Sequence, residues 1–216
     1  MKKEFDLRLQ LPNHALFVGA SMSGKTTLLL RLLKCLDCLH PKPRTVIFYY
    51  DQYQDVYGVL QQSLGEQSIE MILRQGHQVS LDDIEKQDHQ TLVIVDDATE
   101  ETASSSAVAK ITTNGRHKNA SLWLLWHSLY SKHAASRLIT QNVAYIFFLP
   151  SVRLTSQIHS LDTQLRYKGR LVSAYQAAIE ADERDERYLL LDLAPTTPNS
   201  FRMRSRVTET IQLMFM

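Results

Sequence analysis

The chain has 216 residues, of which 44% are hydrophobic and 22% charged, and this composition excludes a disordered or collagen-like protein. Its 24 lysines and arginines against 23 aspartates and glutamates give a net charge of +1, which excludes a generally basic protein that coats nucleic acid. Two cysteines cannot form a disulfide framework, the N-terminus is too polar for a secretory signal, and no apolar run approaches the roughly 20 residues that span a bilayer. We expect a soluble intracellular protein with a single domain over residues 1–216.

Strand-like and helix-like segments alternate along the chain, starting with an alternating pattern typical of an edge strand at Phe5–Leu11. Buried strands are predicted at His14–Ala20, Thr45–Tyr50, Thr91–Val95, Ser121–Trp126, Ala144–Leu149 and Tyr188–Leu193. Helices are predicted at Lys25–Leu39, Asp55–Leu64, Ser104–Thr113 and Ser131–Thr140. Continuously apolar strands separated by helices favour an α/β fold with a mainly parallel central sheet flanked by helices. The charged run Glu180–Arg187 is expected to be a solvated surface segment.

The segment Gly19–Thr26 reads GASMSGKT and fits the pattern G-x-x-x-x-G-K-[ST] between a predicted strand and a predicted helix. Glycines let successive backbone N–H groups surround a phosphate, and the helix N-terminus adds partial positive charge. Lys25 should reach the β- and γ-phosphates of a nucleotide, and the Thr26 hydroxyl should ligate Mg²⁺. A strand-to-helix turn without a ligand is the alternative. The expected nucleotide-binding residues are Gly19, Ala20, Ser21, Met22, Ser23, Gly24, Lys25, Thr26 and Thr27.

Two aspartates, Asp96 and Asp97, follow the buried strand predicted at Thr91–Val95. Because ligands of parallel sheets gather at the carboxyl ends of the strands, both carboxylates should lie beside the phosphate-binding loop. Asp96 is expected to hold Mg²⁺ through water, and Asp97 to polarise the attacking water. An Asp-Asp helix N-cap is the simpler alternative. Together, the loop and the aspartates predict a protein that binds a nucleoside triphosphate with Mg²⁺.

The guanine-recognition pattern N-K-x-D is missing, which argues against a GTPase. Instead, the chain resembles the viral genome-packaging ATPases of the FtsK/HerA superfamily, especially the short form of Maverick/polinton-type elements and related double-stranded DNA viruses. The similar segments are Gly19–Thr26, TVIFYYDQYQDVY, Val93–Asp97, Gly115–Asn119, Leu125–Tyr130, Arg137–Phe147 and the tail YLLLDLAPTTP with the later FRMRSR.

The resemblance implies a RecA-like P-loop ATPase that hydrolyses ATP with Mg²⁺ and packages double-stranded viral DNA into a preformed capsid. It also implies a ring-shaped homo-oligomer, a pentamer or hexamer, with capsid vertex proteins as further partners and no membrane requirement. Such a ring would act inside the infected host cell and transiently at the virion vertex.

Three further catalytic residues are implied by the same resemblance. Arg116, eleven residues before His127, matches an arginine finger that acts across a subunit boundary, and Arg137 is a second candidate for this role. His127 stands at the position that senses the γ-phosphate, where the family usually has glutamine. The simpler interpretations are a solvated surface charge for each arginine and a core histidine that closes a strand for His127.

Two other functions remain open. A nucleotide kinase would transfer phosphate to a small acceptor and would not respond to DNA, although Glu180–Arg187 is a poor match for the arginine-rich lid it would need. A non-enzymatic scaffold would use bound nucleotide only to order a subunit interface. Steady phosphate release would exclude the scaffold, and stimulation by nucleic acid would favour the translocase.

Several residues have structural interpretations at this stage. Cys35 and Cys38 form a C-x-x-C, but without a second pair they are interpreted as thiols that pack a helix, and no metal other than Mg²⁺ is expected. The alternating Arg202, Arg204 and Arg206 are predicted to line one face of an extended segment, where they could meet a neighbouring subunit, nucleotide or DNA. A tyrosine cluster either packs at a sheet edge or stacks on a base; its members are Tyr49, Tyr50, Tyr53 and Tyr57.

Overall fold

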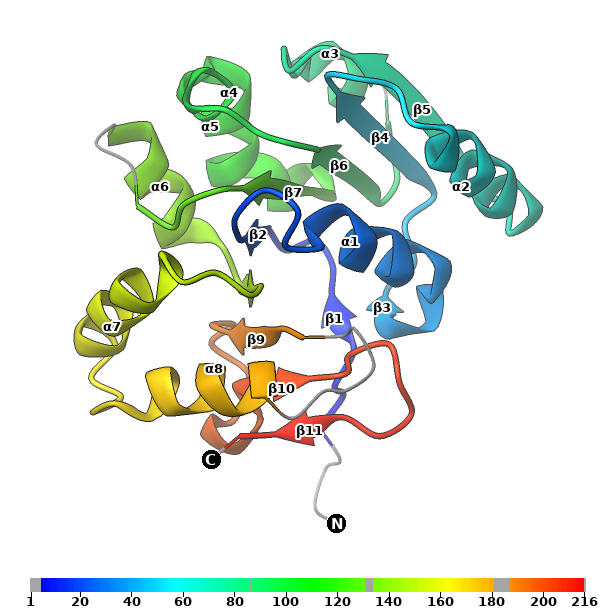
Figure 1. Ribbon diagram of the computed structural model, residues 1–216. Coiled ribbons are helices and arrows are strands. Elements are labelled where there is room, and N and C mark those ends of the chain that lie inside the picture. Colours follow the sequence, from blue (N-terminus) through cyan, green and yellow to red (C-terminus); the bar gives the residue numbers. More distant parts are fainter. Residues whose placement is uncertain (1–4, 86, 131–133, 181–186, 216) are drawn as a thin grey trace.

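The computed structural model describes residues 5–85, 87–130, 134–180 and 187–215. Its strands are β1 (Leu9–Gln10), β2 (Ala15–Val18), β3 (Leu39–His40), β4 (Thr45–Tyr50), β5 (Glu70–Gln75), β6 (Thr91–Val95), β7 (Ala120–Trp126), β8 (Tyr145–Phe148), β9 (Leu189–Asp192), β10 (Met203–Ser205) and β11 (Leu213–Met214). Among the described residues, nine of these strands form one sheet in the order β11-β10-β9-β8-β2-β7-β6-β4-β5 (Figure 1). The other two, β1 and β3, pair with each other.

The large sheet has a parallel part and an antiparallel edge. Strands β8, β2, β7, β6, β4 and β5 are parallel to one another. In contrast, β9 is antiparallel to β8, β10 is antiparallel to β9, and β11 is antiparallel to β10. A short connection without a crossover helix joins β9 to β10, and such a connection suits antiparallel neighbours. The predicted α/β fold with a mainly parallel sheet is confirmed.

Helices cover both faces of the sheet, as the alternation of strands and helices predicts (Figure 1). Consecutive residues of a strand point to opposite faces, so Phe17 of β2 packs in the cluster with Leu29 and Tyr57, whereas Leu16 packs in the cluster with Val108 and Ile158. The α-helices are α1 (Lys25–Lys34), α2 (Asp55–Glu66), α3 (Leu81–Glu85), α4 (Glu100–Ser104), α5 (Ser106–Asn114), α6 (Ala134–Asn142), α7 (Leu154–Gln164) and α8 (Arg170–Glu180). Helices α1 and α2 therefore lie on one face, and α5, α7 and α8 on the other. In the described part of the chain, none of these helices has the length and apolar character needed to cross a membrane.

Two predicted elements are much shorter than expected. The helix predicted at Lys25–Leu39 ends at Lys34, because Cys35 leaves the helical conformation (φ −101°, ψ 67°) and a short 3-10 turn follows. Cys38 is buried and Cys35 partly buried, as expected for thiols that pack a helix end. The edge strand predicted at Phe5–Leu11 is reduced to β1 and lies outside the large sheet. Residues 181–186 of the predicted charged surface run lie outside the described residues.

The prediction that Arg202, Arg204 and Arg206 line one face of an extended segment is wrong. Arg204 is fully buried, because its strand β10 lies inside the sheet between β9 and β11. Its Nη1 lies 3.0 Å from the Asp192 Oδ2 carboxylate atom and donates to the Phe201 carbonyl oxygen at 2.7 Å. Arg202 and Arg206 are partly exposed. Arg204 is therefore a structural residue that a neighbouring subunit or DNA cannot reach.

Candidate nucleotide-binding site

The loop between β2 and α1 is shaped by two glycines. A Cβ atom at Gly19 would lie 2.3 Å from Ser23 Oγ and 3.0 Å from Leu149 Cβ, so only glycine allows the loop to close against the end of β8. Gly24, just before α1, has φ 93°, a left-handed conformation that side chains disfavour. The first turn of α1 thus begins immediately after a tight loop, an arrangement that exposes helix N–H groups to an anion.

Lys25, the first residue of α1, turns its side chain back over this loop. Its Nζ donates to the carbonyl oxygens of Gly19 and Ala20, both at 3.0 Å, and the side chain is buried. Burial lowers the pKa of Lys25, and the carboxylates of Asp97 and Asp96 partly oppose that shift. The ammonium group is therefore held at the mouth of the loop, where phosphate oxygens are expected to bind.

Thr26, at the amino end of α1, meets Asp96, which follows the carboxyl end of β6. The Thr26 hydroxyl donates to Asp96 Oδ1 at 3.1 Å and to Oδ2 at 3.2 Å, and the Tyr57 hydroxyl donates to Oδ2 at 2.8 Å. Burial raises the pKa of Asp96, while the hydrogen bonds from Tyr57 and Thr26 favour its ionised form. A buried carboxylate with a neighbouring hydroxyl is thus fixed beside the phosphate-binding loop.

Asp97 and His127 form a second pair at the same edge. Strand β7 lies between β2 and β6, so the residue that follows β7 stands between the phosphate-binding loop and the aspartates. His127 Nε2 lies 2.6 Å from Asp97 Oδ1, and His127 Nδ1 lies 3.4 Å from Lys25 Nζ. Asp97 has φ 55°, an unusual left-handed conformation for a residue other than glycine. His127 therefore bridges the lysine and the second aspartate, instead of closing a core strand.

These side chains line one cavity with a volume of about 360 Å³. Its lining residues are Ser21, Met22, Gly24, Lys25, Thr26, Thr27, Gln54, Asp96, Asp97 and His127. Of the remaining loop residues, Gly19 and Ala20 hold Lys25 through their carbonyl oxygens, and Ser23 lines a neighbouring cavity. The residues expected to bind nucleotide and metal are thus brought together at one edge of the sheet.

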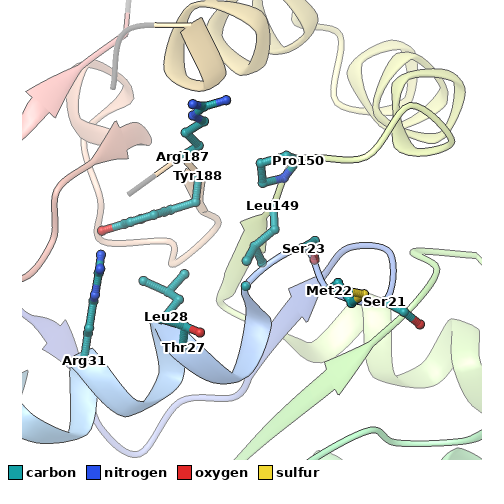
Figure 2. A pocket seen from close by; sticks show the side chains of 11 residues that line it. Ser21, Met22, Ser23, Thr27, Leu28, Arg31, Leu149, Pro150, Arg187 and Tyr188 are labelled. Carbon is teal, nitrogen blue, oxygen red and sulfur yellow. The ribbon is translucent and has the colours of Figure 1, made fainter. Parts of the chain in front are cut away.

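The neighbouring cavity, of about 550 Å³, lies along α1 and opens beside the same loop (Figure 2). Figure 2 shows Thr27, Leu28 and Arg31 projecting from α1, and Tyr188 reaching across from the segment that enters β9. The lining residues are Ser21, Met22, Ser23, Gly24, Thr27, Leu28, Arg31, Leu149, Pro150, Arg187 and Tyr188. Apolar side chains and two arginines line this second cavity, whereas most residues that line the first have polar side chains.

Arg116 and Arg137 are not brought to this edge. Arg116 lies in the 3-10 turn Gly115–Lys118, which precedes the amino end of β7, and its side chain is exposed. Lys25 lies beyond the carboxyl ends of the parallel strands, on the opposite side of the sheet from this turn. Its Nη2 donates to the Asn142 carbonyl oxygen at 3.5 Å. Arg137 is exposed on α6. Neither arginine is among the described residues that line the two cavities at the loop.

Sequence reasoning did not assign Gln54 to the site, and it named Tyr57 only as a member of the tyrosine cluster, without its contact to Asp96. Gln54 precedes α2 and lines the cavity with Lys25, and Tyr57 reaches Asp96 from the first turn of α2. Both follow β4, which neighbours β6, so the rule that places ligands at the carboxyl ends of parallel strands indicates this segment, although it does not give the hydrogen bond from Tyr57 to Asp96. Within the tyrosine cluster, the rings of Tyr50, Tyr53 and Tyr57 pack against one another with centroids 5.6–6.0 Å apart.

The donors at this edge suit Mg²⁺ bound together with phosphates. Mg²⁺ usually takes one or two carboxylate or hydroxyl ligands from a protein and completes its shell with water and substrate phosphates. Thr26 and Asp96 supply such oxygen atoms. No group of three or more His, Cys, Asp or Glu that could hold a metal alone is found in the part of the chain that the structure describes.

A mainly parallel sheet with a glycine-containing loop between its central strand and α1 defines the fold of a P-loop NTPase, and the site has the lysine, hydroxyl and carboxylates of that class. Residues 3–152, more than half of the chain, match the family model described as Poxvirus A32 protein. The chain therefore belongs to the Poxvirus A32 protein family, and its resemblance to viral genome-packaging ATPases is confirmed.

Two solved structures match the chain at low sequence identity. The genome packaging NTPase B204 from Sulfolobus turreted icosahedral virus 2, solved in complex with ATP-gammaS, is 13% identical, with a TM-score of 0.48 over 86% of this chain and 94% of that chain. The Legionella pneumophila ATPase DotB is 16% identical, with a TM-score of 0.41 over 63% of this chain and 40% of that chain. None of the curated proteins matches the chain.

Proposed function

We propose that the protein is an Mg²⁺-dependent ATPase that couples ATP hydrolysis to the movement of double-stranded DNA into a preformed viral capsid. The observation that carries this proposal is the joint placement of Lys25, Thr26, Asp96, Asp97 and His127 around one cavity in a member of a packaging-ATPase family. ATP hydrolysis needs a lysine and a helix N-terminus that bind the phosphates, oxygen donors that hold a metal, and a group that activates water.

The two adjoining cavities suit the two halves of a nucleotide. The triphosphate occupies the polar cavity, where Lys25 contacts the β- and γ-phosphates and Thr26 and Asp96 hold Mg²⁺, which neutralises charge on the phosphate oxygens. The nucleoside occupies the cavity along α1, where Leu28 and Leu149 offer apolar surface to a base. Ser21, Met22, Gly24 and Thr27 line both cavities, which supports a single ligand that extends across the loop.

The DNA is gripped through its phosphates inside a homo-oligomeric ring, a pentamer or hexamer of single ATPase domains spanning residues 1–216. Contacts to phosphates carry no sequence information, as continuous packaging of a genome requires. The net charge of +1 fits basic residues that are concentrated on the pore face rather than spread over the surface. The ring acts in the infected host cell and transiently at the virion vertex, with capsid vertex proteins as partners.

Phosphate release with and without linear duplex DNA, at several protein concentrations, tests this function. We expect turnover to rise with duplex DNA and to rise per subunit with protein concentration as rings form. A nucleotide kinase would release no phosphate to water and would instead phosphorylate a small acceptor. A scaffold that only binds nucleotide would show no steady turnover in any of these conditions.

The two aspartates have different expected roles, which conservative variants separate. Asp96→Asn removes the charge that faces the metal, so we expect about 10–100-fold weaker Mg²⁺-dependent ATP binding. Asp97→Asn should bind MgATP with nearly wild-type affinity but lose about 10²–10⁴-fold in turnover, since only water activation is affected. Nucleotide titrations at fixed and varied Mg²⁺ and phosphate-release rates measure both effects. Identical losses of binding and turnover in the two variants would contradict this division.

Arg116 is proposed to act as an arginine finger in the site of a neighbouring subunit. Its position at the opposite edge of the sheet from Lys25 prevents it from serving the site of its own chain. Arg116→Ala should bind ATP through its intact loop but lose about 10³–10⁵-fold in turnover. The decisive measurement mixes Arg116→Ala with Lys25→Ala, two inactive proteins. Some interfaces of a mixed ring then pair an intact loop with an intact arginine, so part of the activity should return.

Co-assembly of the two variants is checked by size-exclusion chromatography with light scattering before activity is compared. A mixed ring without any activity would contradict a finger supplied by Arg116. The same mixing experiment is repeated with Arg137→Ala and Lys25→Ala. If activity returns in this mixture but not in the mixture of Arg116→Ala and Lys25→Ala, the finger is Arg137.

A further inference from the structure

We propose that Asp97 and His127 work as a single catalytic unit, in which His127 Nδ1 takes the proton from the attacking water and Asp97 orients and stabilises the imidazole. This inference rests on the proposed ATPase function and assigns its general base. It changes the role of Asp97 from the direct acceptor of the water proton to the partner of the group that accepts it.

The hydrogen bonds of His127 define which ring nitrogen carries the proton. Lys25 Nζ, an ammonium group, can only donate, so His127 Nδ1, at 3.4 Å from it, is the acceptor. His127 Nε2 therefore carries the hydrogen and donates to Asp97 Oδ1 at 2.6 Å. In this tautomer the electron pair of Nδ1 faces the lysine that is expected to bind the γ-phosphate. A carboxylate behind the protonated nitrogen is the arrangement that makes histidine an effective base.

The backbone around Asp97 is held so that its carboxylate reaches His127. The Asp96 N–H donates to the Tyr49 carbonyl oxygen of β4, and the Ala98 N–H donates to the Leu125 carbonyl oxygen of β7, both at 2.9 Å. Between these two anchors Asp97 adopts its left-handed conformation, φ 55°. Strained backbone conformations persist where the surrounding structure fixes them, and they are common at functional sites. The Asp97–His127 contact is thus supported by two neighbouring strands.

Asp96 is buried and suits the metal, whereas Asp97 is exposed and lies where water can reach it. Asp96 is 6% exposed and already accepts hydrogen bonds from Thr26 and Tyr57. The side chains of Asp97 and His127 are 65% and 43% exposed, so water can reach both. Asp97 Oδ1 is taken by the histidine N–H, whereas His127 Nδ1 contacts only the lysine that is expected to move to the phosphates, so Nδ1 is the base that becomes available when nucleotide binds.

The hydrolytic step conserves atoms and charge. When ATP binds, the Lys25 ammonium group turns from His127 to the phosphates, which frees Nδ1. Nδ1 takes one proton from water while the water oxygen forms a bond to the γ-phosphorus. The bond from that phosphorus to the bridging oxygen breaks, and ADP leaves with the electron pair. Asp97 stabilises the resulting imidazolium, which releases its proton to solvent, so ATP and water give ADP, hydrogen phosphate and one proton.

The variant His127→Gln tests the base directly. Glutamine can donate a hydrogen bond to Asp97 or to a phosphate, but it cannot take a proton at neutral pH. We expect kcat to fall about 10²–10⁴-fold, with the ATP dissociation constant changed by no more than about threefold. The double variant His127→Gln with Asp97→Asn should be no slower than the slower single variant, because residues that act as a unit are not additive. His159→Gln, an exposed histidine on α7, is the matched control and should retain full turnover.

Chemical rescue separates a base from a group that only positions the phosphate. His127→Ala leaves space in an open cavity, so added imidazole should restore part of the turnover, whereas pyrazole, a ring of the same size and a much weaker base, should not. A kcat for His127→Gln within about threefold of wild type, or equal rescue by pyrazole and imidazole, would overturn the proposal. Wild-type turnover is measured in parallel. Its absence would contradict the ATPase function itself, whereas wild-type turnover with an active His127→Gln would contradict only the role of His127.

Discussion

Lys25→Ala is expected to reduce ATP hydrolysis by at least roughly 100-fold and to weaken nucleotide binding. The ammonium group is held by the carbonyl oxygens of Gly19 and Ala20 at the mouth of the loop, and the structure offers the phosphates no other lysine among the described residues that line the cavity. Its removal takes away the cation expected to contact the β- and γ-phosphates throughout the reaction. Phosphate release and nucleotide titration measure the two effects separately.

The matched control is Lys34→Ala. Lys34 lies in the last turn of the same helix with an exposed side chain, so the substitution removes the same charge far from the loop. Its turnover should equal that of the wild type. Hydrolysis by Lys25→Ala at a rate near wild type would remove the basis for the whole site assignment.

Arg204→Met is expected to lower the free energy of unfolding by about 3–5 kcal/mol, as measured by urea unfolding followed by circular dichroism. Methionine keeps an unbranched apolar side chain in the buried space, but Asp192 then loses the cation at 3.0 Å. Asp192 Oδ1 still accepts from the Ala194 N–H and the Thr197 hydroxyl, which do not compensate a full buried charge. The expected loss therefore comes from an unpaired carboxylate.

The double variant Asp192→Asn with Arg204→Met distinguishes this cause from poor packing. The amide oxygen of asparagine can keep the hydrogen bonds to Ala194 and Thr197 without a charge, so the double variant should be more stable than Arg204→Met alone. Arg202→Met, at a partly exposed position in the same segment, should lose less than either. A double variant as unstable as the single one would indicate that shape, and not charge, dominates at this position.

Most of the phosphate-binding part of the site could be predicted from the sequence, for a local reason. The conformation of the segment from Gly19 to Thr26 depends on glycines and on the helix that begins at Lys25, and both are local properties. The positions of Asp96 and Asp97 required one further rule, that the carboxyl ends of parallel strands share an edge. The sheet order, with β7 between β2 and β6, confirms that rule for these residues and for His127.

Residues whose environment depends on tertiary packing could not be predicted in this way. Arg204 alternates with Arg202 and Arg206 in the sequence, and only the pairing of β10 with both β9 and β11 shows that it is buried. Tyr57 has the composition of a packing residue and does pack, but its hydroxyl also reaches Asp96 across a gap of 39 residues. Such contacts follow from how α2 lies on the sheet, which no local pattern encodes.

The most direct test of the central claim is ATP-driven displacement of a third strand from duplex DNA. A fluorescent oligonucleotide is bound as a triplex near one end of a linear duplex, and its release is followed after addition of protein and MgATP. If the protein moves along duplex DNA, wild-type protein with MgATP should displace the oligonucleotide. The Lys25→Ala variant, or wild-type protein without nucleotide, should not displace it. Steady ATP hydrolysis by wild-type protein without any displacement would contradict the claim that this protein moves double-stranded DNA.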